Sequence, residues 1–590
     1  MKFIWSYMRK HLKAIILVML VKLAATGLEL LLPYILEYMI DYIAPQRDVG
    51  RILLWGGAMI CLALVVRFLS VGANRGSVRI AKKCIYKVRQ DLFTKSMNLS
   101  GDQMDETGLP SLISRMTSDS YNLQSFMQTV QTLAIRAPIL LFGGIIITLT
   151  MDTGLALVLI IMAPILLTAV VIISRKGIPL YDIVQTNLDS VVRIMRENIT
   201  GIRVVKALSK EDYEKRRFEK SNETMSRSEI RASVVMSLPG PVISLAMNVG
   251  LTLVVLIGAL RVNKGVTEPG VILAFLTYFQ MILMGVLILN RFFLNMSKAN
   301  ASANRIAAVM QSPEGLAVRT DVPKAPSDDF IIFDKVSFNY GAGLNADSTK
   351  DDGSASRAFA GGHRENTLID IDFRIPKGGS LGIIGATGSG KTTIINLLMR
   401  FYDPQQGNVF IEGRDVRSYG LDDLRRRFGV VFQNDAIFAD TISENISFGR
   451  DVTDEGLRNA AADAMADEFI EGYDDSYRHQ AAIHGANFSG GQKQRLLISR
   501  ALAAHPEILI LDDSSSALDY RTDAQLRHNI REHYGDTTMI VVAQRVSSIM
   551  NMDQIIVLEE GRIIGKGTHA QLLESTPQYR EIFETQMGEV

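Results

Sequence analysis

The chain has 590 residues, of which 47% are apolar, and its formal net charge is +1. This length exceeds that of one compact domain, and the balanced charge gives no evidence of a nucleic-acid partner, so none is predicted. Two cysteines, Cys61 and Cys84, are too few for a disulfide framework and lack the spacing of metal ligands. Long apolar runs fill the chain before about residue 300, and short apolar strands alternate with polar helices after about residue 325.

The first half is expected to cross a membrane. Its apolar segments are each about a bilayer thick or longer, at 14–43, 52–75, 133–150, 154–175, 236–261 and 268–294. They predict six long helices, the first of them too long for the apolar region of a signal peptide. The connections near 76–132 and 176–235 are long and hold most of the basic residues, so the positive-inside rule places them and both termini in the cytosol.

Charged residues interrupt these apolar runs at Lys22, Glu29, Arg67, Arg136 and Arg291. A charge at membrane depth faces a cavity or a partner, whereas one near a helix end reaches the interface by snorkelling. Snorkelling is the favoured interpretation for Lys22 and Arg136, and both interpretations stay open for Arg67 and Arg291. The segment 275–293 is rich in aromatics and methionine, which suits an adaptable cavity or plain helix packing.

The second half contains a phosphate-binding loop. The pattern G-x-x-x-x-G-K-[ST] is formed by Gly385, Ala386, Thr387, Gly388, Ser389, Gly390, Lys391 and Thr392. It lies between a predicted strand at 380–384 and a predicted helix at 392–401, so backbone N–H groups and the helix dipole would converge on phosphate oxygens. Lys391 would reach the terminal phosphates, and the hydroxyl of Thr392 would bind Mg²⁺. Thr393 is included among the nucleotide-binding residues.

A second strand supports an α/β nucleotide-binding domain over 325–590. The apolar run 508–511 is typical of a buried parallel strand, and Asp512 follows it at the carboxyl edge. There the carboxylate of Asp512 can hold Mg²⁺ through water. ATP and Mg²⁺ are therefore the predicted ligands.

The pentapeptide Phe488-Ser489-Gly490-Gly491-Gln492 is close to the signature of the ATP-binding cassette (ABC) family, which the chain resembles over nearly its whole length. The resemblance implies a half-transporter, with a transmembrane domain at 1–310 followed by one cassette. Two chains would enclose two ATP molecules, each between one phosphate loop and the other chain's Ser489, Gly490, Gly491 and Gln492. It also implies that Tyr340 stacks on adenine and that Gln433, with Thr392 and Asp512, lies at the metal. The segment Glu197–Ala207 resembles a cytoplasmic coupling region.

The sequence departs from the family at the hydrolytic residues. The family's glutamate after the acidic strand is Asp513 here, which draws the carboxylate back by roughly an ångström. The family's switch histidine is Gln544, which can bond a phosphate but cannot titrate. The family's Gly-Glu-Arg-Gly stretch before the signature is here Ala482-Ile483-His484-Gly485, which lacks the glutamate. The first two changes affect one site, so this chain resembles the degenerate subunit of a heterodimeric exporter, with Asp513, Gln544 and Gln433 as its weakened catalytic set.

The stretch 341–366 is rich in Gly, Ser, Ala and Asp and is predicted to be a flexible surface insertion. The resulting hypothesis is an ATP-hydrolysing translocase of the bacterial plasma membrane that exports small hydrophobic or amphipathic compounds of the multidrug type. Its partner would be a second half-transporter with a complete catalytic site. A lipid or peptide exporter, or an ATP-regulated membrane protein that does not pump, are the alternatives.

Overall fold

The computed structural model describes residues 1–313, 315–340, 367–514 and 517–587, which form two compact units. Unit 1 comprises Met1–Met97 and Pro110–Ser312, and unit 2 comprises Asn98–Leu109 and Pro313–Val590. The sequence-based division at 1–310 and 325–590 placed residues 98–109 in the membrane half, whereas they cluster with unit 2. The insertion predicted at 341–366 lies outside the described residues.

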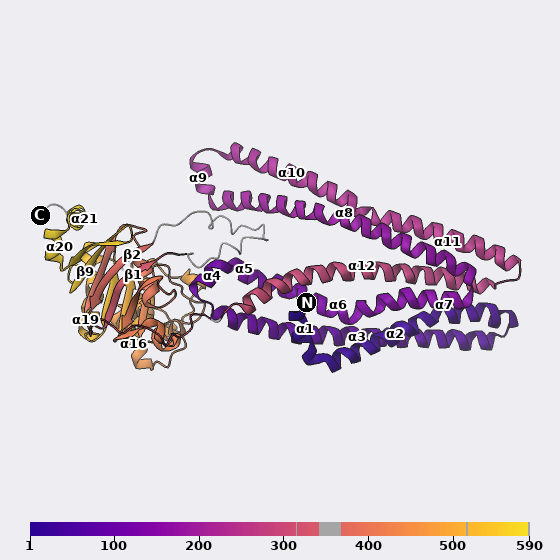
Figure 1. The fold of residues 1–590 in the computed structure, drawn as a ribbon, viewed down its shortest axis with the longest axis horizontal. Helices are drawn as coiled ribbons and strands as arrows, with labels where there is room; N and C mark the ends of the chain where they lie inside the picture. The colour runs from indigo at the N-terminus through magenta and orange to yellow at the C-terminus, as the bar shows by residue number, and fades with distance from the viewer. Residues whose placement is uncertain (314, 341–366, 515–516, 588–590) are drawn as a thin grey trace. The chain divides into compact units, whose positions relative to one another are not determined.

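Unit 1 is built from long helices that run side by side (Figure 1). Their bounds are α1 Lys2–Met8, α2 Leu12–Tyr38, α3 Val49–Met97, α5 Leu109–Ser114, α6 Ser120–Pro138, α7 Gly144–Met151, α8 Thr153–Thr200, α9 Ile202–Ala207, α10 Glu211–Ser237, α11 Pro239–Asn263 and α12 Pro269–Gln311. Helix α9 forms the tip of the hairpin between α8 and α10 and falls within the predicted coupling region (Figure 1).

Within the described chain, six helical segments are long and apolar enough to cross a bilayer, which confirms the predicted number. The helices continue well past the apolar segments seen in the sequence. Helix α3 has 49 residues, or about 70 Å at 1.5 Å per residue, against a hydrocarbon core of about 30 Å. Hydropathy marks only the part in hydrocarbon, so the polar helical extensions are missed.

Two charged residues of the apolar runs bind partners on neighbouring helices. Lys22 of α2 is 3% exposed, and its ammonium group donates to Ser70 Oγ at 2.7 Å and to Asn74 Oδ1 at 3.3 Å on α3. Arg136 of α6 forms an ion pair with Glu29 of α2, with Nη2 and Oε1 2.9 Å apart. The snorkelling interpretation of Lys22 and Arg136 is therefore wrong, because polar groups on adjacent helices bind both side chains inside the bundle; Arg136 Nε alone is buried without a hydrogen-bond partner among the described residues.

The aromatic part of α12 serves mainly in helix packing. Phe275, Tyr278 and Phe279 are buried, and Phe275 and Phe279 belong to a cluster shared with α8 and α11. The hydroxyl of Tyr278 donates to the backbone oxygen of Leu30 on α2 at 2.7 Å. These contacts favour the packing interpretation of the segment over a cavity lining at these three positions.

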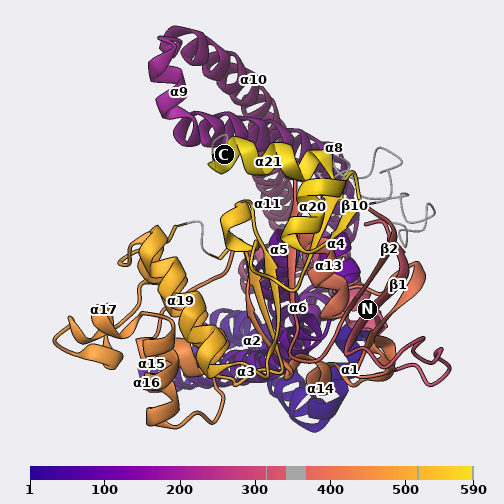
Figure 2. The same cartoon turned by 90° about the vertical axis from the view of Figure 1, so that its left-hand side faces the viewer.

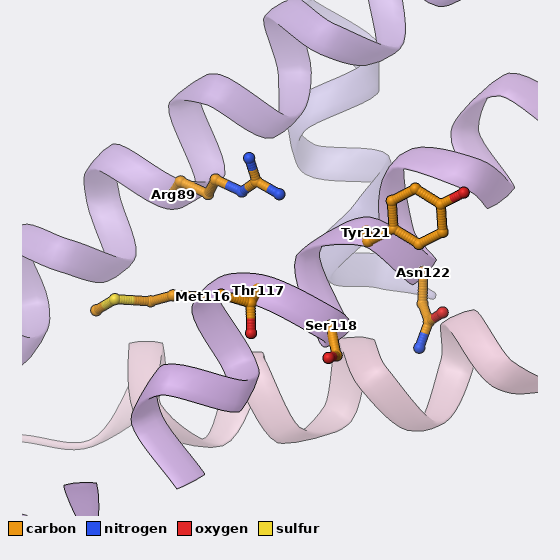
Figure 3. Close-up of a pocket in the computed structure, with 6 residues that line it drawn as sticks. All are labelled: Arg89, Met116, Thr117, Ser118, Tyr121 and Asn122. Atoms are coloured by element: carbon orange, nitrogen blue, oxygen red, sulfur yellow. The ribbon is translucent and has the colours of Figure 1, made fainter. Parts of the chain in front are cut away.

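An open hollow of about 640 Å³ lies between α3 and the start of α6 in unit 1 (Figure 3). It is lined by one cationic side chain and by polar and apolar groups, namely Arg89, Met116, Thr117, Ser118, Tyr121 and Asn122. It belongs to unit 1 and contains no residue of the predicted nucleotide site.

Unit 2 combines two sheets with flanking helices. The order is β2-β1-β4-β5 in the antiparallel sheet and β10-β9-β3-β8-β7-β6 in the larger one, where β9, β3, β8, β7 and β6 are parallel. The strands are β1 Ile331–Phe338, β2 Leu368–Ile375, β3 Ser380–Gly385, β4 Gln406–Ile411, β5 Arg414–Asp415, β6 Phe428–Val431, β7 Ile508–Asp512, β8 Thr538–Val542, β9 Gln554–Glu559 and β10 Arg562–Gly567. This confirms the predicted fold class of six long apolar helices followed by an α/β domain.

Helices lie beside the strands of unit 2 (Figure 2). They are α4 Gly101–Thr107, α13 Lys391–Leu398, α14 Leu421–Arg425, α15 Ile442–Ser447, α16 Asp454–Asp463, α17 Asp467–Glu471, α18 Gly490–Leu502, α19 Tyr520–His533, α20 His569–Ser575 and α21 Pro577–Met587. Strand β7 is buried at every residue, as its apolar run predicted. The central strands β3, β8 and β7 therefore bring their carboxyl ends to one edge, where ligands of open parallel sheets bind.

The ion pair between Arg136 and Glu29 is expected to contribute to the free energy of unfolding. Replacing Arg136 by methionine leaves the carboxylate of Glu29 without this partner, which we expect to destabilise the protein by about 1–3 kcal/mol because both side chains are largely covered. The midpoint of thermal unfolding in detergent should fall by a few degrees. Arg291→Met removes an exposed cation and should change it less. Glu29→Gln combined with Arg136→Met should recover most of the loss, and a double variant as unstable as the single one would show that the pair is not its source.

Candidate nucleotide site

Steric crowding fixes the loop between β3 and α13. A Cβ atom added to Gly385 would lie 2.2 Å from the backbone oxygen of Leu558, and one added to Gly390 would lie 2.5 Å from Leu368 Cδ2. Gly390 also has φ of +101°, a conformation that side-chain-bearing residues rarely adopt. The glycines at 385 and 390 are thus required by geometry, and they let the loop curl tightly ahead of α13.

Polar groups converge inside this loop. The ammonium group of Lys391 donates to the backbone oxygens of Gly385 and Ala386, both at 2.8 Å. Ser389 is 4% exposed, and within the described residues its hydroxyl is buried without a hydrogen-bond partner. A buried hydroxyl without a partner is costly, and a phosphate oxygen would satisfy it. The loop therefore fits a polyphosphate group.

Two oxygen donors meet where the sequence predicted a metal. Thr392 Oγ1 donates to Asp512 Oδ2 at 3.0 Å, which joins the start of α13 to the end of β7. Burial raises the pKa of Asp512, the neighbouring Asp513 raises it further, and Thr392 and Lys391 act in the opposite direction. A cation beside the buried carboxylate would offset this penalty, and hydroxyl and carboxylate oxygens are ligands that suit Mg²⁺.

The predicted hydrolytic residues also meet. Asp513 follows β7 with φ of +51°, a conformation that aspartate tolerates better than most residues. Its Oδ2 accepts a hydrogen bond from Gln544 Nε2 at 2.8 Å and is 3.4 Å from Gln433 Nε2. The two amide groups thus face the same carboxylate oxygen, which is therefore already engaged by donors of the protein.

Tyr340 lies beside the start of α13. Its hydroxyl donates to Thr393 Oγ1 at 3.2 Å and accepts from Asn396 Nδ2 at 3.1 Å. Its ring is edge-on to Phe338 and Tyr402, with centroids 4.8 and 5.1 Å apart. Adenine stacking on Tyr340 stays a prediction, and the ring is held next to the phosphate loop.

The signature residues occupy the exposed N-terminus of α18. Ser489 Oγ accepts from Gln492 N at 3.3 Å, and Gln492 Oε1 accepts from Ser489 N at 2.8 Å, which forms a capping box. The hydrogen bonds between Ser489 and Gln492 stay within this helix start. Thr392 instead binds Asp512, and Gln433 and Gln544 bind Asp513, at the carboxyl edge of the sheet. The site thus assembles the predicted residues in two separate groups.

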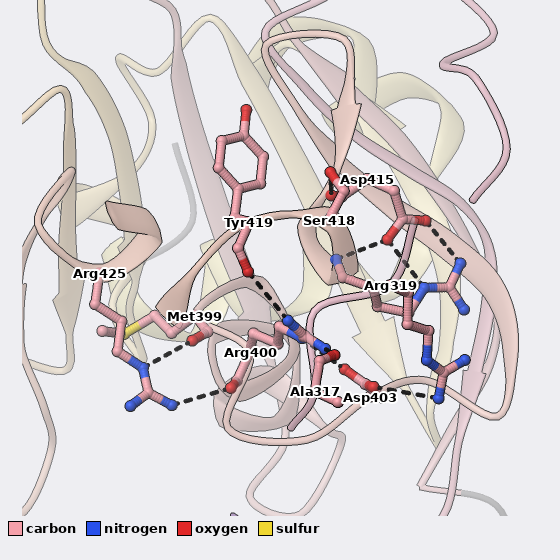
Figure 4. A network of polar contacts seen from close by, with 10 residues as sticks. Ala317, Arg319, Met399, Arg400, Asp403, Asp415, Ser418, Tyr419 and Arg425 are labelled. Carbon is pink, nitrogen blue, oxygen red and sulfur yellow. Dashed lines mark hydrogen bonds and ion pairs between the residues drawn. The ribbon is translucent and has the colours of Figure 1, made fainter. Parts of the chain in front are cut away.

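Sequence reasoning missed a polar network that follows α13 (Figure 4). Arg400 is fully buried and donates to the backbone oxygens of Ala317 and Tyr419 at 2.7 and 3.3 Å, and to Asp403 Oδ1 at 3.0 Å. Arg319 also contacts Asp403, at 3.5 Å. The segment 400–403 is therefore bound to the chain that precedes β1. Partners more than 80 residues away give no local sequence signal.

The comparisons with known proteins agree across the chain. A family model described as "ABC transporter transmembrane region" matches residues 15–287, and one described as "ABC transporter" matches residues 368–516. Uncharacterized ABC transporter ATP-binding proteins of Mycobacterium bovis and Mycobacterium tuberculosis are each 31% identical over 585 residues, covering 98% of this chain and 97% of the relative. One from Bacillus subtilis is 30% identical over 571 residues, covering 97% and 96%.

A solved structure shares the fold. It is titled "Structure of a bacterial Atm1-family ABC exporter with ATP bound", and it superposes with a TM-score of 0.78 over 98% of this chain and 99% of that chain. The sequence identity is 22%, so this likeness concerns the fold alone.

The geometry at Gly390 predicts how a substitution there changes the affinity for ATP. Gly390→Ala adds a Cβ against Leu368 in a left-handed conformation, so the loop must open and the affinity for ATP should fall at least tenfold. Gly413→Ala is the matched control, because φ there is +73° and a Cβ would meet nothing within 4 Å. Titration with a fluorescent ATP analogue measures both variants. Equal losses of affinity would contradict the steric explanation.

Proposed function

Because the chain belongs to the ABC transporter family, we propose that it is one half of an ATP-driven exporter that moves hydrophobic or amphipathic compounds out of the cytosol. The observation that carries this proposal is the presence, on one chain, of six candidate spans and a complete phosphate-binding loop. ABC importers normally keep the cassette on a separate chain, so fusion favours export. The proposed location is the bacterial plasma membrane, with the nucleotide-binding domain in the cytosol.

The proposed cycle is alternating access. ATP closes two cassettes on each other, with the exposed Ser489 and Gly490 of each chain placed against the nucleotide of the other. Substrate and ATP each bias an assembly with two states, and hydrolysis resets it. When bound, Mg²⁺ would neutralise phosphate charge, and Thr392 and Asp512 are the residues that would hold it.

The cargo class rests on the apolar character of the helices. A pocket of about 260 Å³ between α2, α3 and α12 is lined almost wholly by apolar side chains, namely Leu32, Pro33, Leu36, Met59, Ile60, Ala63 and Thr277. Such a lining favours hydrophobic over strongly polar compounds. This supports the multidrug-type assignment ahead of a peptide exporter, with a lipid exporter as the second candidate because lipid tails suit the same lining.

The partner is proposed to be an unlike chain. General-base catalysis needs a carboxylate within reach of the attacking water, and Asp513 is one methylene shorter than the glutamate of the family. Its Oδ2 also faces the amide groups of Gln544 and Gln433. This geometry supports slow hydrolysis at the site built on this phosphate loop. The intact signature would then serve a partner whose hydrolytic residues are complete.

Transport is tested in inside-out vesicles that contain this chain and the product of the neighbouring gene. We expect ATP-dependent accumulation of a fluorescent hydrophobic dye, and we expect Lys391→Ala in this chain to abolish or strongly reduce it. A nonhydrolysable ATP analogue should not support accumulation. ATP-induced ion flux without dye accumulation would instead indicate a regulated membrane protein that does not pump.

Degeneracy is tested by restoring the family residues. Asp513→Glu together with Gln544→His should raise ATP turnover of the purified chain at least tenfold, because a longer carboxylate and a titratable partner are both regained. Asp513→Asn is the control and should not raise turnover. Rapid turnover by the unaltered chain alone would contradict the assignment of a slow site.

A further inference from the structure

The loop that carries Gln544 leaves the sheet with backbone groups that need partners. Strand β8 ends at Val542, and the N–H of Ala543 donates to the backbone oxygen of Ile383 at 3.1 Å. The carbonyl of Gln544 and the N–H of Val546 come after this point and lie outside the ladder of the sheet. Val546 is fully buried, so an unpaired N–H there would be costly.

The side chain of Gln586, near the end of α21, pairs with both groups. Its Nε2 donates to the backbone oxygen of Gln544 at 2.8 Å, and its Oε1 accepts from the N–H of Val546 at 2.8 Å. A primary amide has its donor and its acceptor side by side, so it matches a carbonyl and an N–H that are two residues apart in a turn. The two bonds together fix the backbone on both sides of Arg545.

Helix α21 is packed against the domain on the face that bears Gln586. Tyr579 is fully buried, and Ile582 and Phe583 pack against the core cluster that contains Tyr579 and Val546. These three residues of α21 and Gln586 follow one another at spacings of three and one, so all four lie on one face of the helix. Burial of the apolar members of this face therefore directs Gln586 to the loop.

The far end of the same loop has a separate support. Arg527 of α19 donates to the backbone oxygen of Ser547 at 3.4 Å and also to that of Ser548. Asp523 orients this guanidinium group, with Arg527 Nε and Asp523 Oδ1 3.2 Å apart. Loss of Gln586 would therefore release the part of the loop next to Gln544 and leave the rest of the turn attached.

The backbone at Gln544 sets the position of a side chain in the hydrolytic group. Gln544 Nε2 donates to Asp513 Oδ2 at 2.8 Å. The side chain of Gln544 is exposed, so packing restrains it little and the bonds of its own backbone fix where it starts. A series of hydrogen bonds thus joins Gln586 to the backbone of Gln544 and the side chain of Gln544 to Asp513. A displacement of about 1 Å at such a group is enough to slow a reaction strongly.

We propose that Gln586 is a positioning residue of the hydrolytic site, which holds the backbone at Gln544 so that the side chain there meets Asp513. The inference rests on the proposed function, because it takes positions 513 and 544 as the hydrolytic pair. A helix that follows the loop 42 residues later in the chain thereby sets the geometry of the hydrolytic step. The phosphate loop, which binds ATP, does not depend on it.

Turnover and affinity measured together test this role. The chain with Asp513→Glu and Gln544→His supplies a measurable rate, and Gln586→Met is added to it because methionine has a similar shape and makes neither bond. We expect kcat to fall about fivefold or more while the affinity for a fluorescent ATP analogue stays within about twofold. Gln578→Met is the matched control, because Gln578 is an exposed residue earlier on α21, and it should change neither quantity.

Gln586→Glu in the same background separates the two bonds. A carboxylate still accepts from the N–H of Val546 but cannot donate to the carbonyl of residue 544, so kcat should be intermediate near neutral pH. Protonation of the carboxylate restores a donor. The ratio of this kcat to that of the chain with Gln586 should therefore rise as the pH falls from about 7.5 to about 5.5. A residue needed only to pack α21 would give no such pH profile.

Hydrogen–deuterium exchange tests the same contact without hydrolysis. Gln586→Met in the otherwise unaltered chain should speed exchange of peptides covering residues 543–549 about fivefold or more, and peptides of the phosphate loop should not change. Unchanged exchange at 543–549 would overturn the proposal, as would faster exchange with an unchanged kcat. An equal fall in kcat and affinity would indicate general disruption and also overturn it. Absence of turnover in the Asp513→Glu, Gln544→His chain would instead contradict the slow-site assignment, and the exchange result would then decide the role of Gln586.

Discussion

The close backbone approach at the end of β3 is the constraint on which the nucleotide-binding unit depends. Gly385 lies so near the carbonyl of Leu558 on β9 that no side chain fits, and Gly390 turns the chain into α13 with a positive φ. That path places Lys391 and Thr392 at the carboxyl edge of the parallel sheet, where β7 delivers Asp512. A looser loop would separate the hydroxyl of Thr392 from the carboxylate of Asp512. The metal position would then no longer lie next to the phosphate position.

Features with a local cause could be predicted from the sequence. The phosphate loop is contiguous, and its glycines, lysine and threonine each have a steric or electrostatic reason to occupy their positions. The buried strand before Asp512 was evident because a strand covered on both faces needs an unbroken apolar run. The meeting of Asp513 with Gln544 follows from β7 and β8 being neighbours, since parallel strands bring their carboxyl ends together. The family resemblance points to both residues, and the pairing of β7 with β8 brings their side chains within hydrogen-bond distance.

Features that depend on distant partners could not be predicted in this way. The sequence predicts that Lys22 and Arg136 reach the membrane interface, because a single apolar run does not reveal that a neighbouring helix offers Ser70, Asn74 or Glu29. Arg400 gave no signal, because its partner at Ala317 is a backbone carbonyl that any residue could provide. The docking of Asp105 on Tyr402 joins side chains 297 residues apart, and only the folded chain shows that they meet.

That separation has a consequence for how the protein is made. At about 5–20 residues per second, a ribosome needs roughly 15–60 s to pass from Asp105 to Tyr402, and four of the six spans are synthesised in between. During this interval the carboxylate of Asp105 lacks the hydroxyl of Tyr402 as its donor. The backbone N–H of Gly101 likewise lacks the carbonyl of Phe401 that accepts its hydrogen bond. Ser100 and Gln103 form a capping box at the start of α4, and both are already synthesised, so the box can favour the first turn of α4 before Phe401 and Tyr402 exist. The start of α4 is therefore specified by local residues, whereas the contacts that hold it form only after Phe401 and Tyr402 are translated.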